Sequence, residues 1–109
     1  MIVSAWNNGS QHPSGAGYGL KIALSDRDCH FKREWRSIIL ELEGKPSPVE
    51  VNINKEPFWG NTCRELISLG IGKWLYQTGL APWPKGYSPK LLLKPLGNNR
   101  FSLKQMIDE

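Results

Sequence analysis

The sequence predicts a mainly β (α+β) fold in one domain, residues 1–109, with two short helices. Eleven Gly and eight Pro in 109 residues leave little room for long helices. Residues 38–42 and 49–53 alternate apolar and polar side chains with the period of a half-buried strand. No apolar stretch approaches the roughly 18 residues of a spanning helix. These observations exclude a helical bundle and a membrane-embedded chain.

In the first half of the chain, the expected elements are a strand, a short helix and a hairpin. Residues 18–24 form the strand. Ser25 and Asp28 have the spacing of a capping box, which predicts a helix that places Phe31 and Trp35 on one face. The strands 38–42 and 49–53 then pair in antiparallel fashion across a turn that contains two prolines.

The second half is expected to contain a strand over 64–68, a helix over 70–78 and a closing hairpin of 90–96 with 100–103. An alternative helix would run from the capping box at 62–65 to Thr78. Gly70 and Gly72 disfavour it, because each costs about 1 kcal/mol inside a helix. The expected buried stripe of the shorter helix is Ile71, Trp74, Leu75 and Thr78, with Gly79 as its stop.

The formal net charge is +4, and the basic excess lies in the second half of the chain. Residues 1–54 carry six basic and six acidic side chains, whereas residues 55–109 carry eight basic and four acidic ones. Such an excess fits a polyanionic partner, and it fits a merely soluble surface equally well.

The compartment expected from the sequence is the cytoplasm. Residues 1–6 lack the basic start and apolar core of a signal peptide. Cys29 and Cys63 stand 34 residues apart without a CxxC pair, so reduced thiols are expected, with a single disulfide as the alternative. With only His12 and His30 beside them, no metal site and no cofactor are expected.

Three patterns resemble catalytic motifs. Residues 15–19 have the spacing GxGxG, but a strand follows, so a flexible strand entry is favoured over a phosphate-binding loop. Asp26, Asp28 and His30 do not all share a helical face, and the capping box accounts for both carboxylates.

Asp28, Glu43 and Lys45 form the third pattern, which has the residue types of a metal-dependent nuclease or hydrolase. Against this interpretation, Lys45 precedes a proline inside a turn. It is kept as an alternative function.

Two loops rich in polar side chains are the candidate nucleic-acid-binding segments, and no catalytic residue is assigned. The first covers residues 7–19 and has no charge; the second, 54–64, combines amide, basic and aromatic groups. Asn and Gln can read adenine and Arg or Lys can read guanine, while basic side chains hold phosphates. The candidate residues are Asn7, Asn8, Ser10, Gln11, His12, Ser14, Lys55, Trp59, Asn61, Arg64, Lys90 and Lys94.

The run from Glu65 to Leu80 is similar to the strand, glycine turn and Trp-containing helix of the DNA-binding pseudobarrel superfamily. That group includes plant B-three domains and the effector domains of certain restriction endonucleases. The resemblance extends over about residues 18–104, but residues 82–86 replace the usual Gly-Asp turn. It implies an open seven-stranded β-pseudobarrel with two short helices, in which 1–17 is a flexible arm or loop, 18–104 the barrel and 105–109 a tail. It also implies two arms, 7–16 and 54–64, that enter the major groove.

The leading hypothesis is a non-catalytic module that binds double-stranded DNA. Lys90 and Lys94 are expected to hold phosphates, so their removal should flatten the salt dependence of binding. A partner protein would supply any catalysis, and no membrane is involved. A barrel that binds RNA or protein is the further alternative. Trp35 and Trp74 are expected in the core and Trp59 partly exposed.

Overall fold

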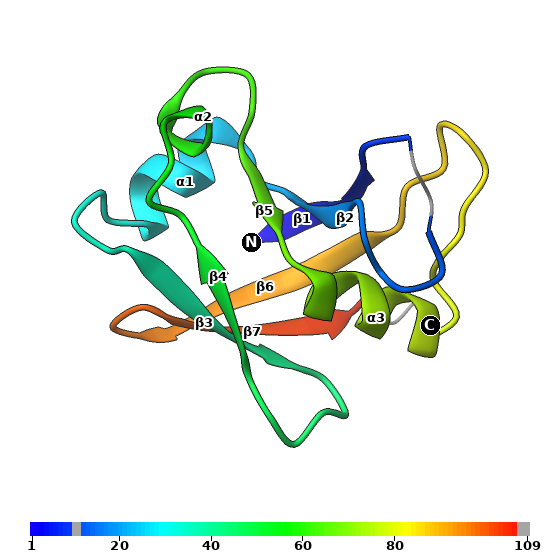
Figure 1. Ribbon diagram of the computed structural model, residues 1–109. Coiled ribbons are helices and arrows are strands. Elements are labelled where there is room, and N and C mark those ends of the chain that lie inside the picture. Colours follow the sequence, from blue (N-terminus) through cyan, green and yellow to red (C-terminus); the bar gives the residue numbers. More distant parts are fainter. Residues whose placement is uncertain (10–11, 107–109) are drawn as a thin grey trace.

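The protein, described here over residues 1–9 and 12–106 by a computed structural model, is built on one seven-stranded sheet that curls into a nearly closed barrel (Figure 1). The strand order is β4-β3-β7-β6-β1-β2-β5. The strands are β1 Ile2–Asn7, β2 Tyr18–Lys21, β3 Ser37–Leu42, β4 Val49–Asn52, β5 Glu65–Ile67, β6 Lys90–Gly97 and β7 Arg100–Gln105. The helices are α1 Leu24–His30, α2 Glu56–Trp59 and α3 Leu69–Gln77. The mainly β fold with seven strands is confirmed, and the described residues form three short helices instead of the expected two.

The helices, turns and loops that connect the strands lie at the two ends of the barrel, which are called the α1 end and the α3 end. All neighbouring strands pair in antiparallel fashion except β3 and β7, which are parallel, and the edge strands β4 and β5 approach each other without pairing. At the α1 end lie α1, the β4–β5 connection and the β6–β7 turn. At the α3 end lie the β1–β2 loop, the β3–β4 turn and α3 (Figure 1).

Residues 1–17 were expected to form a flexible arm or loop. That expectation is wrong for residues 2–7, which form strand β1. This strand pairs with β2 on one side and β6 on the other. Val3 and Ala5 are buried, while Ser4 between them points outward. The alternation was readable in the sequence, but it is short and begins at the first residues of the chain. Of the described residues, 8–9 and 12–17 belong to the connection between β1 and β2.

The two predicted hairpins are confirmed. In β3–β4, Ile38 pairs with Val51 and Leu40 with Val49, as the alternation predicted. In β6–β7 the chain reverses through Asn98, whose positive φ of 49° is a conformation that asparagine tolerates.

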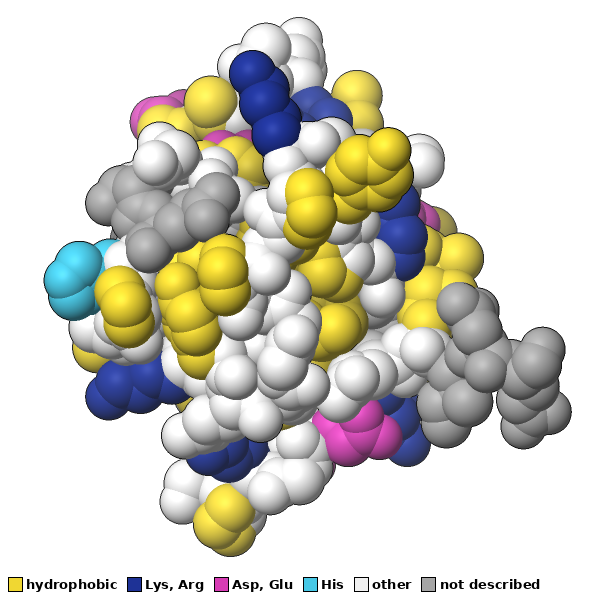
Figure 2. Space-filling model, turned by 90° about the vertical axis from the view of Figure 1, so that its right-hand side faces the viewer, with side chains coloured by type: hydrophobic (Ala, Val, Ile, Leu, Met, Phe, Trp, Pro, Cys, Tyr) yellow, Lys and Arg dark blue, Asp and Glu magenta, His cyan; other side chains and the backbone are white. Residues whose placement is uncertain are grey.

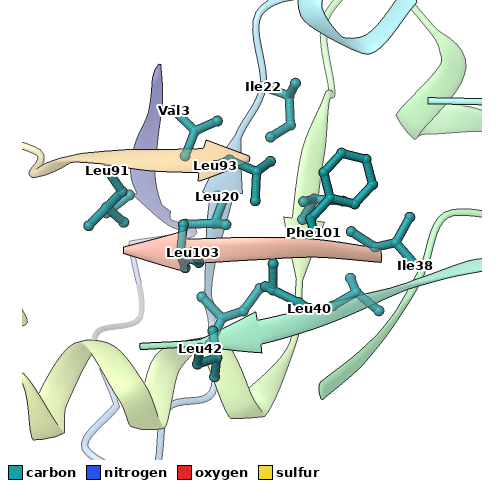
Figure 3. Close-up of a cluster of buried hydrophobic side chains, with 14 of the residues drawn as sticks. Val3, Leu20, Ile22, Ile38, Leu40, Leu42, Leu91, Leu93, Phe101 and Leu103 are labelled. Atoms are coloured by element: carbon teal, nitrogen blue, oxygen red, sulfur yellow. The ribbon is translucent and has the colours of Figure 1, made fainter. Parts of the chain in front are cut away.

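A single hydrophobic core fills the barrel (Figure 3). Figure 3 shows that strands distant in the sequence, such as β1, β3 and β7, send alternate side chains into the same interior. Leu20, Ile38, Leu40, Leu93 and Leu103 are completely buried. Burial of apolar side chains of this size stabilises the fold by about 1.5–3 kcal/mol each.

Helix α1 differs from its prediction at both ends. It begins at Leu24 after Ala23, which makes no side-chain capping bond, so Ser25 is inside the helix and the predicted capping box is wrong. The helix ends at His30, and Phe31 and Trp35 lie beyond it. Their rings still meet on Phe101, with centroids at 4.7 Å and 6.3 Å. Contact with the core, instead of a shared helical face, brings these aromatic residues together.

Helix α3 confirms the shorter of the two helices considered and begins one residue earlier. The Ser68 hydroxyl accepts a hydrogen bond from the Gly70 amide at 3.2 Å and caps the helix. Trp74 is buried and its indole Nε1 donates to the Glu43 carbonyl at 2.8 Å. Trp59 is half-buried as expected, whereas Trp35 is half-buried and does not belong to the fully buried core. No helix of the described residues is long and apolar enough to cross a membrane.

Tyr18, at the start of β2, is completely buried under Tyr76 and Trp83. Its hydroxyl lies 3.0 Å from the Tyr76 hydroxyl. Burial, with that hydrogen bond, raises the pKa of Tyr18 far above its ordinary value of 10.0. The folded protein therefore keeps the Tyr18 proton at a pH where the unfolded chain loses it.

This difference predicts that the free energy of unfolding falls as the pH rises above about 10, because deprotonation favours the unfolded chain. Below about pH 10, Tyr18 does not make the free energy of unfolding depend on pH. Above it, Tyr18 lowers that free energy by an amount that approaches about 1.4 kcal/mol per pH unit. Urea denaturation between pH 8 and 11 measures the slope, and Tyr18→Phe should reduce it. An identical slope in both proteins contradicts the account of Tyr18.

Candidate nucleic-acid interface

The first candidate loop, residues 8–17, joins β1 to β2 and is held by its own hydrogen bonds. The Asn8 amide donates to the Gly17 carbonyl at 2.9 Å, and the Gly15 amide donates to the His12 carbonyl at 3.0 Å. The His12 ring Nδ1 lies 2.7 Å from the Ser14 hydroxyl. Asn8, His12 and Ser14 are exposed and Asn7 is half-buried. Ser10 and Gln11 lie outside the described residues.

The loop is fixed to the barrel through a close approach of two glycines. Gly15, with a positive φ of 97°, lies against α3 at Gly72. A Cβ atom on Gly72 would stand 2.0 Å from the Gly15 carbonyl oxygen, so only glycine fits there. Gly15 of the GxGxG pattern therefore allows the loop to pack closely against α3. The residue it packs against is Gly72, one of the two glycines that disfavour the longer helix.

The second candidate loop, residues 54–64, contains the unpredicted helix α2. Phe58 is completely buried, and the indole Nε1 of Trp59 donates to the Ile53 carbonyl at 2.9 Å. The guanidinium groups of Arg27 and Arg33 lie 5.5 Å and 5.6 Å from the centre of the Trp59 ring. Trp59 is therefore packed into the loop, and its ring is already in contact with two cations.

Arg27, which sequence reasoning did not single out, holds the second loop against α1. It is a buried arginine that donates from Nη1 to the carbonyls of Phe58 (2.9 Å) and Gly60 (2.5 Å). Its Nε and Nη2 donate to the exposed carboxylate of Asp28, at 3.1 Å and 2.9 Å. No signal in the sequence identifies this role, because the carbonyls are 31 and 33 residues away.

The candidate residues of the second loop divide into anchored and available side chains. Arg64 donates from Nε to the Ile22 carbonyl at 2.9 Å and from Nη1 to the Asn61 carbonyl, so its guanidinium is engaged in holding the loop. The Asn61 side chain is exposed, and Lys55 is half-buried at the start of α2. Of the four candidate residues in this loop, only Asn61 has an exposed side chain.

The two loops stand at opposite ends of the same strand pair. The first loop leads directly into β2 and the second leads into β5, and β2 and β5 are antiparallel with Gly19 opposite Ile67. Figure 1 shows the loops on opposite sides of the molecule with these strands between them. From Tyr18 to Lys21 the strand rises roughly 10 Å, which is close to the roughly 12 Å width of the major groove of B-DNA.

The outer face between the loops carries a cation and a nearly buried anion. Lys21 is exposed, and its ammonium lies 3.9 Å from Oε2 of Glu65 on the neighbouring strand. That oxygen is buried and has no hydrogen-bond partner among the described residues. Figure 2 views the right-hand side of Figure 1, where basic side chains are scattered around the rim and hydrophobic ones lie both near the middle and at the rim.

The other predicted residues are not brought to the loops. Lys90 and Lys94 are exposed on the outer face of β6, two strands from β2 in the order β6-β1-β2. Asp28 is at the α1 end of the barrel, whereas Glu43 and Lys45 follow β3 at the α3 end. The trio of the nuclease alternative is therefore separated by the length of the barrel and shares no site.

The two cysteines are free and exposed, Cys29 on α1 and Cys63 in the second loop. No group of three or more His, Cys, Asp or Glu side chains that could hold a metal ion occurs among the described residues. Neither is a pocket found in that part of the protein.

Comparison with models of known protein families, with curated proteins and with solved structures gave no match.

Proposed function

We propose that the protein is a non-catalytic module that binds double-stranded DNA, with the loops 8–17 and 54–64 entering the major groove. The observation that carries this proposal is the placement of two polar loops at opposite ends of the β2–β5 pair. Their separation along the strands matches the scale of the groove. Hydrogen bonds within the first loop, and those from Arg27 of α1 to the second, support binding by preformed segments, which lose little conformational entropy when they engage the duplex.

The exposed groups of the loops have the chemistry for reading base edges. Asn8 and His12 of the first loop and Asn61 of the second carry neutral donors and acceptors. Amide side chains pair with adenine through two hydrogen bonds, each such pair contributing about 1–3 kcal/mol of discrimination. Lys21 and Lys55 lie on or beside the face between the loops and are the best-placed phosphate contacts. Phosphate contact by Lys90 and Lys94 stays a prediction.

Substitution in each loop tests the proposal. A duplex site is first selected from a randomised pool, and its affinity is measured by fluorescence anisotropy at 50 and 200 mM salt. Asn8→Ala and Asn61→Ala should each weaken binding to the selected site by about 5- to 150-fold and change binding to random duplex little.

Gln77→Ala is the matched control, since it removes an exposed amide from α3 outside both loops. It should leave both affinities unchanged. Absence of any duplex binding at 50 mM salt, where electrostatic attraction is least screened, overturns the proposal.

A further inference from the structure

The outer face of β1, β6 and β7 carries three lysines around two exposed apolar side chains. The strand registers place Ile2 opposite Leu92 and Leu92 opposite Lys104, with Lys90 and Lys94 two residues either side of Leu92. All five side chains are exposed, whereas Leu91 and Leu93 between them are completely buried in the core. We call these five residues (Ile2, Lys90, Leu92, Lys94 and Lys104) the lysine face.

The lysine face has no ion pair within the described residues, although Glu43 lies beside Lys104. None of its three ammonium groups forms an ion pair there, and that of Lys90 bonds the neutral hydroxyl of Ser4 at 2.6 Å. The acid nearest in register is Glu43, which follows Leu42 opposite Leu103 and whose carboxylate accepts a hydrogen bond from the Gln105 amide at 3.1 Å, beside Lys104. The other acid on this side, Glu41, lies opposite Ser102 and is already paired with Arg100 at 3.1 Å. Among the described residues, Lys90 and Lys94 therefore have no acidic neighbour in register, and the only acid beside Lys104 forms no ion pair with it.

Leu92 occupies the centre of this arrangement. In a sheet, side chains two residues apart on one strand are about 7 Å apart and neighbouring strands are about 5 Å apart, so all three lysines stand close around it. Leu92 is 40% exposed and Ile2 is 55% exposed. A partner that covers both removes apolar surface from water at the point where the charges converge.

The lysine face is distinct from the surface between the two loops. Strand β6 is separated from β2 by β1, and the sheet curls into a barrel, so the outer faces of β6 and β2 point in different directions. A duplex held between the loops would lie on the β2–β5 side. The lysine face is thus free for a second partner.

We propose that the lysine face docks an acidic segment of a partner protein in which an apolar side chain is flanked by carboxylates. Charge complementarity selects this occupant, since its carboxylates would meet Lys90, Lys94 and Lys104. Its apolar side chain would cover Leu92 and Ile2. A phosphodiester backbone supplies anions but no apolar group for the centre of the face, so a polypeptide is favoured over nucleic acid.

Fluorescence anisotropy with a labelled peptide tests this assignment. The probe has Leu and Phe at its centre and three Glu on each side, and a second probe replaces the Leu and Phe by Ser at the same charge. The first should bind more tightly than the second by about tenfold, because only it covers Leu92. The triple variant K90Q/K94Q/K104Q should weaken binding of the first probe by about tenfold.

The control variant K32Q/K45Q/K85Q removes three exposed lysines elsewhere and gives the same net charge. It should leave binding of the peptide unchanged, and Leu92→Thr should reduce it at an unaltered melting temperature. Equal loss in both triple variants, or equal binding of the two peptides, overturns the proposal in favour of unspecific charge attraction. A loss of duplex affinity specific to K90Q/K94Q/K104Q, without loss of peptide binding, overturns it in favour of phosphate contact.

Discussion

Replacement of Gly72 by alanine is expected to lower the free energy of unfolding by about 3 kcal/mol, at the upper end of typical overpacking costs. The added Cβ would lie 2.0 Å from the carbonyl oxygen and 2.5 Å from the Cα of Gly15. Both are backbone atoms, so no flexible side chain can move aside. In a helix interior alanine is favoured over glycine by about 1 kcal/mol, and we expect the cost of the clash to exceed this gain in stability. Urea denaturation followed by tryptophan fluorescence measures the change.

Gly60→Ala is the matched control for this substitution. Gly60 has a φ of −80°, and its nearest neighbour to an added Cβ is the Pro57 carbonyl oxygen at an ordinary 3.6 Å. Its effect should stay within about 0.5 kcal/mol. If Gly72→Ala is as stable as the parent protein, the first loop does not lie on α3. The geometry of that arm is then wrong.

Replacement of Arg27 by methionine is expected to cost about 3 kcal/mol of stability. Methionine fills much of the same space but donates no hydrogen bond, so the carbonyls of Phe58 and Gly60 lose the guanidinium that satisfies them. Because these carbonyls belong to the second loop, the loop should loosen together with the loss of stability. Chemical denaturation measures the first effect, and limited proteolysis at the loop measures the second.

Arg33→Met is the control that distinguishes the hydrogen bonds of Arg27 from the contact that both arginines make with the Trp59 ring. Arg33 also lies against the Trp59 ring, but it is exposed, and its only ion pair in the described part of the chain is with the exposed Glu56 at 3.5 Å. The expected cost is below about 0.5 kcal/mol. Equal effects of the two substitutions would show that the stacking on Trp59, and not the hydrogen bonds of Arg27, holds the loop.

The hairpins and α3 could be predicted because their signals are local. Ile38, Leu40 and Leu42 alternate within one strand, and Ile71, Trp74 and Leu75 recur within two turns of one helix. The parallel pairing of β3 with β7 joins residues about sixty positions apart and has no such signal. Strand β1 was missed because its short alternation could be interpreted as a flexible start.

The bounds of α1 and the existence of α2 could not be predicted because tertiary contacts decide them. Helix α1 starts before its capping box, and Arg27 within it is bound to carbonyls of the second loop. Helix α2 is four residues long and contains Pro57 in its first turn, so no periodicity marks it. The loops themselves were predicted from composition. The anchoring of Trp59 and Arg64 within them depends on backbone carbonyls that no side-chain pattern reveals.

Chemical-shift mapping with the selected duplex decides whether the two loops form one DNA-binding surface. Amide resonances of the intact ¹⁵N-labelled protein are followed as duplex is added at 50 mM salt. We expect the largest shifts in both loops, 8–17 and 54–64, and in β2 and β5 between them, with the β3–β4 turn at 43–48 unchanged. Shifts confined to one loop, or centred on β6 and β7, would contradict a major-groove grip by two arms.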